Sequence, residues 1–279
     1  MMSCVLMPED VRYSVLMSVY SRESADHLRA AMESIWNQTL CTDDFVLVCD
    51  GPLSEELDSV IAKMQAGHPE LHVVRLKKNA GLGPALNEGL TYCRNELVAR
   101  MDSDDISCPD RCECQIRAFL AHPEVSVISG TVEEFSVSPD MPEASRVLPE
   151  HHEEIVSFAR RRNPFNHPCV MYKKSAVISA GGYLDFYLLE DYDLWIRMLA
   201  KGFRGYNLQQ TLLMMRAGSG LYLRRSGWKY AKSQAALFRR MKEMGFITYR
   251  EYLVSTVIRT VVSMLPNALR KKLFYKAVR

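Results

Sequence analysis

Four apolar segments alternate with helical segments over residues 13–102, and this alternation constrains the fold more than any other feature of the sequence. Each apolar segment is six to eight residues long and rich in Val and Leu. Near-continuous apolar strands separated by helices are typical of a parallel sheet with helices on both faces. The sequence therefore predicts an α/β fold with a Rossmann-like, mostly parallel sheet that is flanked by helices. The predicted strands are 13–20, 45–50, 71–76 and 97–102, and the predicted helices are 25–37, 57–64 and 81–93.

The pattern becomes less regular in the second half of the chain. We expect short strands at 125–130 and 131–137, a helix near 153–162 and a helix at 191–201. The segment 163–168, Asn-Pro-Phe-Asn-His-Pro, is too rich in turn-forming residues for regular structure. A chain of 279 residues, of which 48% are hydrophobic, is long enough to bury the core of one large domain with a C-terminal appendage.

Polar side chains follow three of the predicted strands, at the edge of the sheet where ligands gather in folds of this kind. Tyr20 ends the first strand, Asp50 ends the second, and Asp102-Ser103-Asp104-Asp105 ends the fourth. Carboxylates this close together repel one another unless a cation is present, and Mg²⁺ typically joins one or two carboxylates with substrate phosphates. The alternative is an Asp-rich turn that caps a helix beginning near Pro109. The second acidic strand end, at Asp50, favours the metal site.

Two further motifs have both a functional and a purely structural interpretation. Residues 77–87 place Gly81 and Gly83 before a helix, where the backbone can approach an anion, but they lack the third glycine of a dinucleotide-binding loop and the Lys-Ser/Thr pair of a Walker loop. A simple tight turn explains this segment equally well. Glu190 and Asp191 begin a helix, where acids either complement the helix dipole or serve as a carboxylate base. Spacing alone favours the dipole.

The eight cysteines are scattered along the chain, and residues 1–11 lack the basic stretch and the apolar stretch of a signal peptide. We therefore expect reduced thiols in a cytoplasmic protein. Cys108, Cys112 and Cys114 are close in sequence, but no further Cys or His nearby completes a zinc site, so ordinary buried thiols are the favoured interpretation. The sequence contains no run of about 18 apolar residues, so a membrane-spanning helix is not expected.

The charge of the chain is unevenly distributed. Residues 213–279 contain 15 Lys or Arg against two acids and carry a net charge of +13, whereas the whole chain carries only +2. Such a segment indicates an anionic partner: membrane lipid, a diphosphate-linked substrate or nucleic acid. No recognised nucleic-acid module accompanies it, so nucleic acid is not expected. Arg216, Arg224 and Arg225 suit a diphosphate, which Arg can bind through two parallel hydrogen bonds.

Apolar residues recur at helical spacing between Val254 and Leu265, and again between Leu269 and Phe274, beside the basic residues 270–272. A basic amphipathic helix of this kind can lie in an anionic membrane interface. The alternative is that the helix packs its apolar face on the rest of the protein. The cluster of Lys and Arg slightly favours the membrane.

Six motifs connect the segments described above to a known family. They are Ser-Val-Tyr-Ser-Arg-Glu, Val-Cys-Asp-Gly-Pro, Asn-Ala-Gly-Leu-Gly-Pro-Ala-Leu-Asn, Met-Asp-Ser-Asp-Asp, Asn-Pro-Phe-Asn-His-Pro and Glu-Asp-Tyr-Asp-Leu-Trp. In this order, they resemble the bacterial family 2 glycosyltransferases of GT-A fold, and within them the subgroup that builds O-antigen, capsule and exopolysaccharide repeat units. The resemblance covers residues 13–243 and implies inverting, metal-dependent transfer of a hexose, galactose or glucose. The donor would be a UDP-sugar, the cofactor Mn²⁺ or Mg²⁺, and the acceptor a polyprenyl diphosphate-linked sugar at the inner face of the cell membrane.

The resemblance also implies which residues bind the donor. Ser18, Tyr20 and Asp50 would hold the nucleoside, with Asp50 accepting a hydrogen bond from the base. Asn79 and Gly81 would border the same pocket.

A second group of residues is implied to carry the chemistry. Asp102 would contact ribose or the metal ion, and Asp104 would bind the ion that bridges the two phosphates. Asp191 would be the catalytic base, and Glu190 would orient it or the acceptor. His167 lies in the acceptor-side segment, where a role in acceptor binding and a structural role are equally supported.

We expect a catalytic domain at 1–243 and a basic amphipathic helical tail at 244–279. The catalytic domain would have a nucleotide-sugar half at about 13–130 and an acceptor half at about 131–243. Two other functions stay open: a nucleotidyltransferase that makes nucleotide sugars, and a non-catalytic membrane-associated binding protein. The first would need a Gly-rich loop with Lys or Arg after the first strand, which the sequence lacks, and the presence of Asp104 and Asp191 argues against the second.

Overall fold

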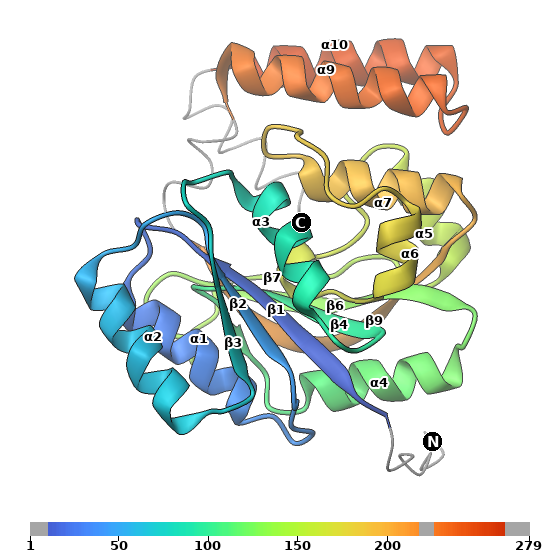
Figure 1. The fold of residues 1–279 in the computed structure, drawn as a ribbon. Helices are drawn as coiled ribbons and strands as arrows, with labels where there is room; N and C mark the ends of the chain where they lie inside the picture. The colour runs from blue at the N-terminus through green and yellow to red at the C-terminus, as the bar shows by residue number, and fades with distance from the viewer. Residues whose placement is uncertain (1–10, 218–225, 266–279) are drawn as a thin grey trace.

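The computed structural model describes residues 11–217 and 226–265 and places a nine-stranded sheet between two layers of helices (Figure 1). The strand order is β3-β2-β1-β4-β8-β6-β9-β5, and β7 pairs with β6 outside this path. The strands are β1 (Tyr13–Val19), β2 (Phe45–Cys49), β3 (Leu71–Arg75), β4 (Leu97–Asp102), β5 (Ile106–Ser107), β6 (Val125–Phe135), β7 (Ala144–Arg146), β8 (Met171–Lys173) and β9 (Arg204–Arg216). The helices are α1 (Ala25–Trp36), α2 (Glu55–Gly67), α3 (Leu82–Tyr92), α4 (Arg111–Ala121), α5 (His152–Ala159), α6 (Lys174–Ser179), α7 (Glu190–Ala200), α9 (Gly227–Glu243) and α10 (Tyr249–Met264), with a short 3-10 helix, η1, at His167–Cys169.

Four neighbouring strands, β3, β2, β1 and β4, are parallel, as the sequence predicted. β8 runs antiparallel to both β4 and β6, and β9 runs parallel to β6. The predicted α/β architecture with a mostly parallel sheet is therefore confirmed. Because β1, β2 and β4 end at the same edge of the sheet, we call this edge, with the residues that follow the three strands, the carboxyl edge.

The second half of the sheet differs from the prediction. The two strands expected at 125–130 and 131–137 form one long strand, β6, whose register against β9 shifts between Gly130 and Thr131. The extra residues at this shift are Gln209 and Gln210 of β9, so β6 continues without a break on its own side of the pair. The sequence predicts neither β8, which has only three residues, nor β9, whose alternation is interrupted by Gln209 and Gln210.

Two helices differ from their predicted bounds for reasons that lie at their ends. α2 begins at Glu55 rather than at residue 57, because the Ser54 side chain accepts a hydrogen bond from the Leu57 backbone N–H. α5 ends at Ala159, and the chain turns through the following residues ahead of Pro164, which disfavours helical backbone in the residue before it.

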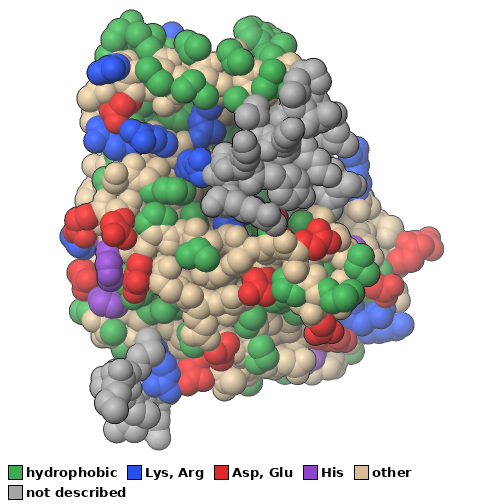
Figure 2. All heavy atoms as spheres, turned by 180° about the vertical axis from the view of Figure 1, so that it is seen from behind, with side chains coloured by type: hydrophobic (Ala, Val, Ile, Leu, Met, Phe, Trp, Pro, Cys, Tyr) green, Lys and Arg blue, Asp and Glu red, His purple; other side chains and the backbone are tan. Residues whose placement is uncertain are grey.

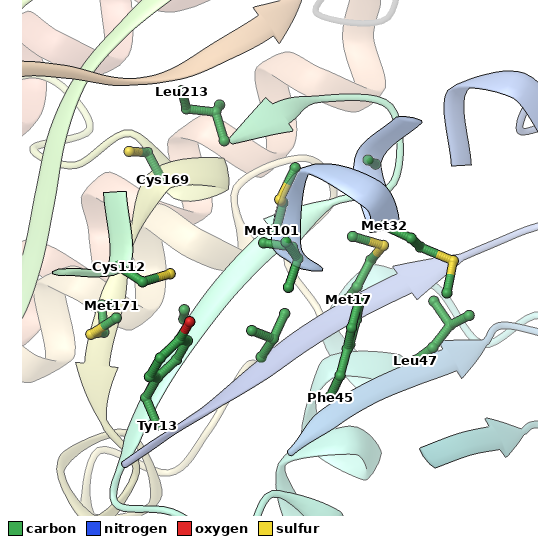
Figure 3. Close-up of a cluster of buried hydrophobic side chains, with 14 of the residues drawn as sticks. Tyr13, Met17, Met32, Phe45, Leu47, Met101, Cys112, Cys169, Met171 and Leu213 are labelled. Atoms are coloured by element: carbon green, nitrogen blue, oxygen red, sulfur yellow. The ribbon is translucent and has the colours of Figure 1, made fainter. Parts of the chain in front are cut away.

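Alternate residues of the strands pack against α1, α2 and α4 on one face of the sheet. Tyr13 and Met17 of β1 point to this face with Phe45 and Leu47 of β2, beside Met32 of α1 (Figure 3). All five side chains are fully buried, and each contributes about 1.5–3 kcal/mol relative to an exposed side chain. The period of two that identifies the strands in the sequence therefore also determines this layer of the core.

The opposite face of the sheet is covered by α3, α5, α6, α7 and α9. Val98 of β4 points to this face, where the fully buried Trp195 of α7 packs edge-on against Phe165 with ring centroids 5.5 Å apart. Since side chains alternate along a strand, Arg100 and Asp102 follow Val98 on the same face. The polar end of β4 therefore lies on the side of the sheet that α7 covers.

A buried carboxylate joins the strands at the end of the sheet opposite to the carboxyl edge. Asp44, which precedes β2, is fully buried and accepts hydrogen bonds from the Ser14 hydroxyl (2.5 Å), the Arg94 backbone N–H (2.7 Å) and the Arg94 Nε (3.1 Å). These donors compensate for the loss of water around the charge.

The helices α9 and α10 form a hairpin that lies over α7, on the side where the parallel strands end (Figure 1). Arg240 of α9 donates from Nη1 to Oδ1 of Asp193 on α7 (2.9 Å), and Arg197 donates from Nε to Oδ2 of the same carboxylate (2.7 Å). Asp193 is fully buried, so its charge ties the hairpin to α7. No helix in the described part of the chain is both long enough and apolar enough to cross a bilayer.

Candidate active site

The loop after β3 closes over the end of β2 through direct hydrogen bonds. Oδ1 of Asp50 accepts from the Ala80 backbone N–H (2.7 Å), Oδ2 accepts from the Gly81 N–H (3.0 Å), and the side-chain amide of Asn79 donates to the Asp50 carbonyl (3.2 Å). The structure thus brings together Asp50, Asn79 and Gly81, three of the predicted donor-binding residues. A carboxylate has about four acceptor positions, so these two N–H groups fix the orientation of Asp50 without using its full capacity.

Two glycines allow this loop to lie close to its neighbours. Gly51 has φ +90°, and a Cβ added there would lie 2.6 Å from the backbone nitrogen of Asn79. Gly83, in the first turn of α3, faces α7: a Cβ there would lie 3.3 Å from the Tyr183 Cβ and 3.8 Å from the Glu190 Cβ. The loop therefore lies against the residues that follow β2, and the first turn of α3, which comes directly after the loop, lies against the start of the helix that carries Glu190.

The first and fourth strands end beside each other at the same edge. Ser18 of β1 is the register partner of Asp102 on β4, and Tyr20 follows β1 with an exposed ring. The predicted nucleoside-binding residues Ser18 and Tyr20 therefore lie next to the acidic end of β4, with Asp50 beyond them at the end of β2.

Three carboxylates meet at the end of β4. Asp102, Asp104 and Asp105 each offer a ligand oxygen, and these oxygens lie within 4.8 Å of one another. In the residues that the structure describes, no other group of three His, Cys, Asp or Glu side chains is placed to hold a metal ion. The sequence marked Asp102 and Asp104 as ligands and left Asp105 without a role, although it directly follows the Asp-x-Asp motif.

Burial and mutual repulsion favour the protonated forms of Asp104 and Asp105 when no ion is bound. Burial, followed by the charges of Asp102 and Glu23, raises the pKa of Asp104 to about 7. Burial and then Asp102 and Asp104 raise the pKa of Asp105 well above its usual range. Oδ1 of Asp105 accepts from the Arg216 backbone N–H (2.7 Å), whereas its buried Oδ2 has no hydrogen-bond partner within the described structure. Oxygen-only ligands with a buried, unsatisfied carboxylate oxygen fit Mg²⁺ or Mn²⁺.

Glu190 and Asp191 begin α7 on the other side of the acidic group. Burial, and then the charge of Asp191, raises the pKa of Glu190 to about 7; Asp102 raises it further and Arg100 lowers it. Oδ2 of Asp191 accepts from the side-chain amide of Asn163 (2.6 Å), and its Oδ1 accepts from the Tyr192 backbone N–H (2.7 Å). Sequence reasoning missed the role of Asn163, although it is the first residue of the Asn-Pro-Phe-Asn-His-Pro motif.

His167 is buried beneath the site. A ring nitrogen lies 3.1 Å from the hydroxyl of Tyr183, and the imidazole packs near Trp195. Burial, and then the charge of Arg100, holds the pKa of His167 well below its usual range, so the ring is neutral at pH 7. This placement favours the structural interpretation over direct contact with an acceptor.

The three cysteines that are close in sequence, Cys108, Cys112 and Cys114, are thiols whose surroundings, within the described residues, do not form a metal site. Cys112 is fully buried, and burial raises the pKa of Cys108 and of Cys114 to about 11, so these are protonated thiols at pH 7. They belong to no candidate metal group among the described residues, which favours ordinary thiols over zinc.

Arg216 lies beside the acidic group, where its Nε donates to the Asp104 carbonyl (3.0 Å). Arg224, Arg225 and the tail segment 266–279 lie outside the described residues.

Comparison with known sequences identifies relatives over almost the whole chain. The profile of glycosyl transferase family 2 matches residues 14–182. The amylovoran biosynthesis glycosyltransferase AmsE of Erwinia amylovora is 42% identical over 95% of this chain and 98% of its own length. The UDP-Gal:α-D-GlcNAc-diphosphoundecaprenol β-1,3-galactosyltransferase of Escherichia coli is 36% identical over 96% of this chain and 97% of its own length.

Comparison with solved structures shows the same fold. The chain superimposes on the S. aureus TarS complex with UDP-GlcNAc with a TM-score of 0.68, over 89% of this chain and 72% of that chain, at 15% identity. It superimposes on the Pyrobaculum calidifontis mannosyltransferase complex with GDP-Man and Mn²⁺ with a TM-score of 0.64, over 95% of this chain and 80% of that one, at 16% identity. These likenesses confirm the GT-A fold that the motifs implied.

The metal-free protein should lose stability as the pH rises from about 5 to about 8. Folding raises the pKa of Asp104 and of Glu190 to about 7, so between the unfolded pKa near 4 and the folded pKa the folded protein binds more protons than the unfolded chain. Its free energy of unfolding therefore falls across this window. Thermal unfolding with and without Mn²⁺ should show a metal-induced increase in Tm that grows with pH, because protons and the ion compete for the same carboxylates.

Two variants decide whether the acidic group is responsible for this pH dependence. Asp104→Asn should remove most of the metal-induced increase in Tm, whereas Asp140→Asn, at an exposed aspartate between β6 and β7, should leave it unchanged. A metal-induced increase that is equal at all pH values, or equal in both variants, would contradict the assignment.

The contact between Gly51 and the Asn79 loop can be tested against a glycine of similar backbone conformation. Gly51→Ala should lower the free energy of unfolding by about 3 kcal/mol, because a positive φ costs about 1–2 kcal/mol and the forced contact with the Asn79 backbone costs about as much again. Gly202→Ala lies at φ +85° with no atom within 4 Å of the added Cβ. It should lower the free energy of unfolding only by the cost of the positive φ, about 1–2 kcal/mol. Urea unfolding measures both, and equal losses would contradict the close approach.

Proposed function

The chain belongs to glycosyl transferase family 2, and on that basis we propose that it is an inverting hexosyltransferase of bacterial surface polysaccharide synthesis. One observation carries the proposal: the acidic group 102–105, the Asp50 loop and the Glu190–Asp191 pair meet at the carboxyl edge. Family membership favours glycosyl transfer over the nucleotidyltransferase and the non-catalytic binding protein that the sequence alone left open.

The proposed donor is UDP-galactose or UDP-glucose. The E. coli relative is named for transfer from UDP-Gal, and it matches this chain over nearly its full length. In this proposal Ser18, Tyr20 and Asp50 hold the nucleoside, and Asn79 and Gly81 border it. The orientation that the loop N–H groups impose on Asp50 supports a fixed acceptor for the base.

Asp104 and Asp102 are the residues that we propose to hold Mn²⁺ or Mg²⁺. When bound there, the ion would act as a Lewis acid toward the leaving nucleoside diphosphate. The protein itself concentrates carboxylates whose mutual repulsion is relieved by a divalent cation, and this repulsion adds to the burial that raises the pKa of Asp104 to about 7. Asp105 belongs to the same acidic group, and its buried Oδ2 has no hydrogen-bond partner within the described structure.

Asp191 is the proposed catalytic base. The amide of Asn163 and the N–H of Tyr192 hold its carboxylate in one orientation. As an acceptor hydroxyl oxygen bonds to the anomeric carbon, its proton passes to Asp191, and the bond from that carbon to the diphosphate breaks with its electron pair leaving on oxygen. A single displacement inverts the anomeric configuration, so an α-linked donor gives a β-linked product. Glu190 is proposed to orient Asp191 or the acceptor.

The proposed acceptor is a sugar linked to a polyprenyl diphosphate at the inner face of the cell membrane. The name of the E. coli relative includes an N-acetylglucosaminyl diphosphoundecaprenol acceptor, which supports this class of substrate. Residues 213–279 add a net charge of +13, which is suited to the acceptor diphosphate and to anionic lipid headgroups.

The outer side of α10 supports contact with the membrane. Six large hydrophobic side chains there are 43–61% exposed, and we call them the α10 apolar face: Leu253, Val254, Val257, Ile258, Val261 and Met264. The other side of the helix is held to the protein, since Arg259 donates to Gln234 (3.1 Å) and Glu251 pairs with Arg160 (3.1 Å). Figure 2 shows hydrophobic side chains along the top of the molecule, with Lys and Arg side chains below them. The exposure of these side chains supports the membrane over the alternative that the stripe packs inward, although Val262 and Leu265 of the same stripe are half-buried.

The domain division stays part of the proposal. We propose a catalytic domain at 1–243 and a membrane-facing tail at 244–279, of which the structure describes residues 244–265. The proposed boundary falls directly after α9, before the turn that leads to α10.

Asp191→Asn tests the base. The variant should lose about a hundredfold to ten-thousandfold in kcat for transfer, which is the range that general-base catalysis contributes. Its affinity for UDP in the presence of Mn²⁺ should stay within about twofold, since the substitution preserves shape and Asp191 is not a proposed donor ligand. Asp185→Asn, at an exposed position before α7, is the control and should keep full activity. Loss of UDP binding by Asp191→Asn would indicate a structural role instead.

The α10 apolar face is tested with vesicles. Val257→Glu should weaken binding to phosphatidylglycerol-containing vesicles about tenfold, because it removes roughly 1.5 kcal/mol of apolar burial and adds a negative charge. Val137→Glu, at a 79% exposed valine in the loop between β6 and β7, should bind as the wild type does. Co-sedimentation measures both, and equal binding by the two variants would contradict the proposal. A lipid-free dimer that Val257→Glu dissociates, seen by analytical ultracentrifugation, would show that a second copy covers the face.

A further inference from the structure

A buried arginine lies directly beneath the acidic group. Arg100 belongs to β4, two residues before Asp102 and therefore on the same face of the sheet. Its side chain is 1% exposed, at a position between Val98 and Asp102 where the neighbouring layer is apolar and aromatic. A charged residue is rarely buried so completely unless a specific partner compensates for its desolvation.

Both oxygens of Asp102 are that partner. Nη1 of Arg100 donates to Oδ2 of Asp102 (3.0 Å), and Nη2 donates to Oδ1. Two parallel hydrogen bonds between a guanidinium and a carboxylate fix the plane of the carboxylate as well as its position. The side chain of Asp102 remains 36% exposed, so the outer side of this fixed carboxylate faces the site.

The backbone of Arg100 is held just as firmly as its side chain. Its N–H donates to the Val170 carbonyl (2.9 Å), and its carbonyl accepts from Nη2 of Arg111 (2.6 Å), a second fully buried arginine. These contacts fix the backbone of β4 at the residue from which the guanidinium extends to Asp102. Any rotation of Asp102 breaks a charge-assisted hydrogen bond in a buried environment, where such a bond is strongest.

The charge of Arg100 also acts on the remaining carboxylates of the site. Burial and neighbouring acids raise the pKa of Asp104, Asp105 and Glu190, and the charge of Arg100 opposes this rise at all three. His167 lies within reach of the same charge and is neutral. Arg100 thus supplies positive charge on the buried side of the acidic group, whereas the side chain of Asp102 is partly exposed.

We propose that Arg100 is a positioning residue that holds Asp102 in the orientation needed to bind the nucleoside diphosphate donor. This inference rests on the proposed function, because it assigns Asp102 to the donor. With its plane fixed by the guanidinium, Asp102 presents its outer lone pairs to a ribose hydroxyl or to the metal ion without losing conformational freedom on binding. Preorganisation of this kind increases affinity for the donor without any new contact.

A double-mutant cycle separates this role from a general contribution to folding. The probe is the nucleoside diphosphate that the wild type binds in the presence of Mn²⁺, chosen from UDP, GDP and dTDP, and the readout is its dissociation constant by calorimetry. Arg100→Lys keeps the positive charge but loses the bidentate geometry, and Asp102→Asn keeps the shape but loses the charge. Each should weaken binding on the order of tenfold, and the double variant should bind no more weakly than Asp102→Asn alone. Arg100→Gln completes the same cycle if Arg100→Lys does not fold.

The control is Arg94→Lys, which disturbs a pair of the same chemistry at the other end of the sheet. Arg94 binds the fully buried Asp44, so this variant should lower Tm while leaving nucleotide affinity unchanged. Wild-type affinity in Arg100→Lys, with a fall in Tm like that of Arg94→Lys, would overturn the proposal and leave Arg100 a structural role. An additive cycle would also overturn it, because Arg100 would then act independently of Asp102. Absence of nucleotide binding by the wild type would instead overturn the proposed donor, and with it the assignment of Asp102.

Discussion

Repulsion between carboxylates at the carboxyl edge is the constraint on which the rest of this site depends. Asp102, Asp104 and Asp105 place ligand oxygens within 4.8 Å of one another, and at an effective dielectric constant near 20 each ionised pair costs about 3 kcal/mol or more. The structure meets this cost in two ways: burial keeps protons on Asp104 and Asp105 near pH 7, and Arg100 neutralises Asp102 from below. A divalent cation can displace these protons and neutralise the carboxylates in their place. A site of this kind is suited to a metal–diphosphate ligand, in which the ion binds both the carboxylates and the phosphates.

The proposed carboxylate base lies near this group because segments that are distant in the sequence meet there. Gly83 allows the start of α3 to lie against Glu190, which couples the Asp50 loop to α7. Asn163 comes from the irregular segment before η1 and holds the carboxylate of Asp191. The absence of regular structure in that segment lets its polar side chains reach both the core and the site. The two halves of the site are therefore joined through α3 and α7 as well as through the sheet.

The sequence predicts those parts of this structure that are set by local patterns. The strands β1 to β4 and their intervening helices follow from hydrophobic periodicity, and the acidic residues at the strand ends are visible as Asp50 and the Asp-x-Asp motif. The sequence does not reveal β8 and β9, because a three-residue strand has no measurable period and the register shift of β9 interrupts its alternation. Nor does it reveal the contact of Asn163 with Asp191, or the role of Arg100, because both depend on which residues tertiary packing brings together. A charged residue at an inward-facing position of a strand was nevertheless a signal in the sequence, since Arg100 interrupts an otherwise apolar run.

The hairpin of α9 and α10 links the exposed α10 apolar face to α7, the helix that carries Asp191. Asp193 lies two residues after Asp191, is fully buried, and is shared by Arg197 of the same helix and Arg240 of α9. If α9 moved away from α7, Asp193 would keep Arg197 but lose the charge-assisted hydrogen bond from Arg240, so the movement would lower the stability. Because α10 packs on α9, the α10 apolar face keeps a fixed position relative to the start of α7. The hairpin also lies on the side where the parallel strands end (Figure 1). If a bilayer binds this face, as we propose, its surface would lie on the same side of the molecule as the site, where a lipid-linked acceptor can reach Asp191 without leaving the membrane.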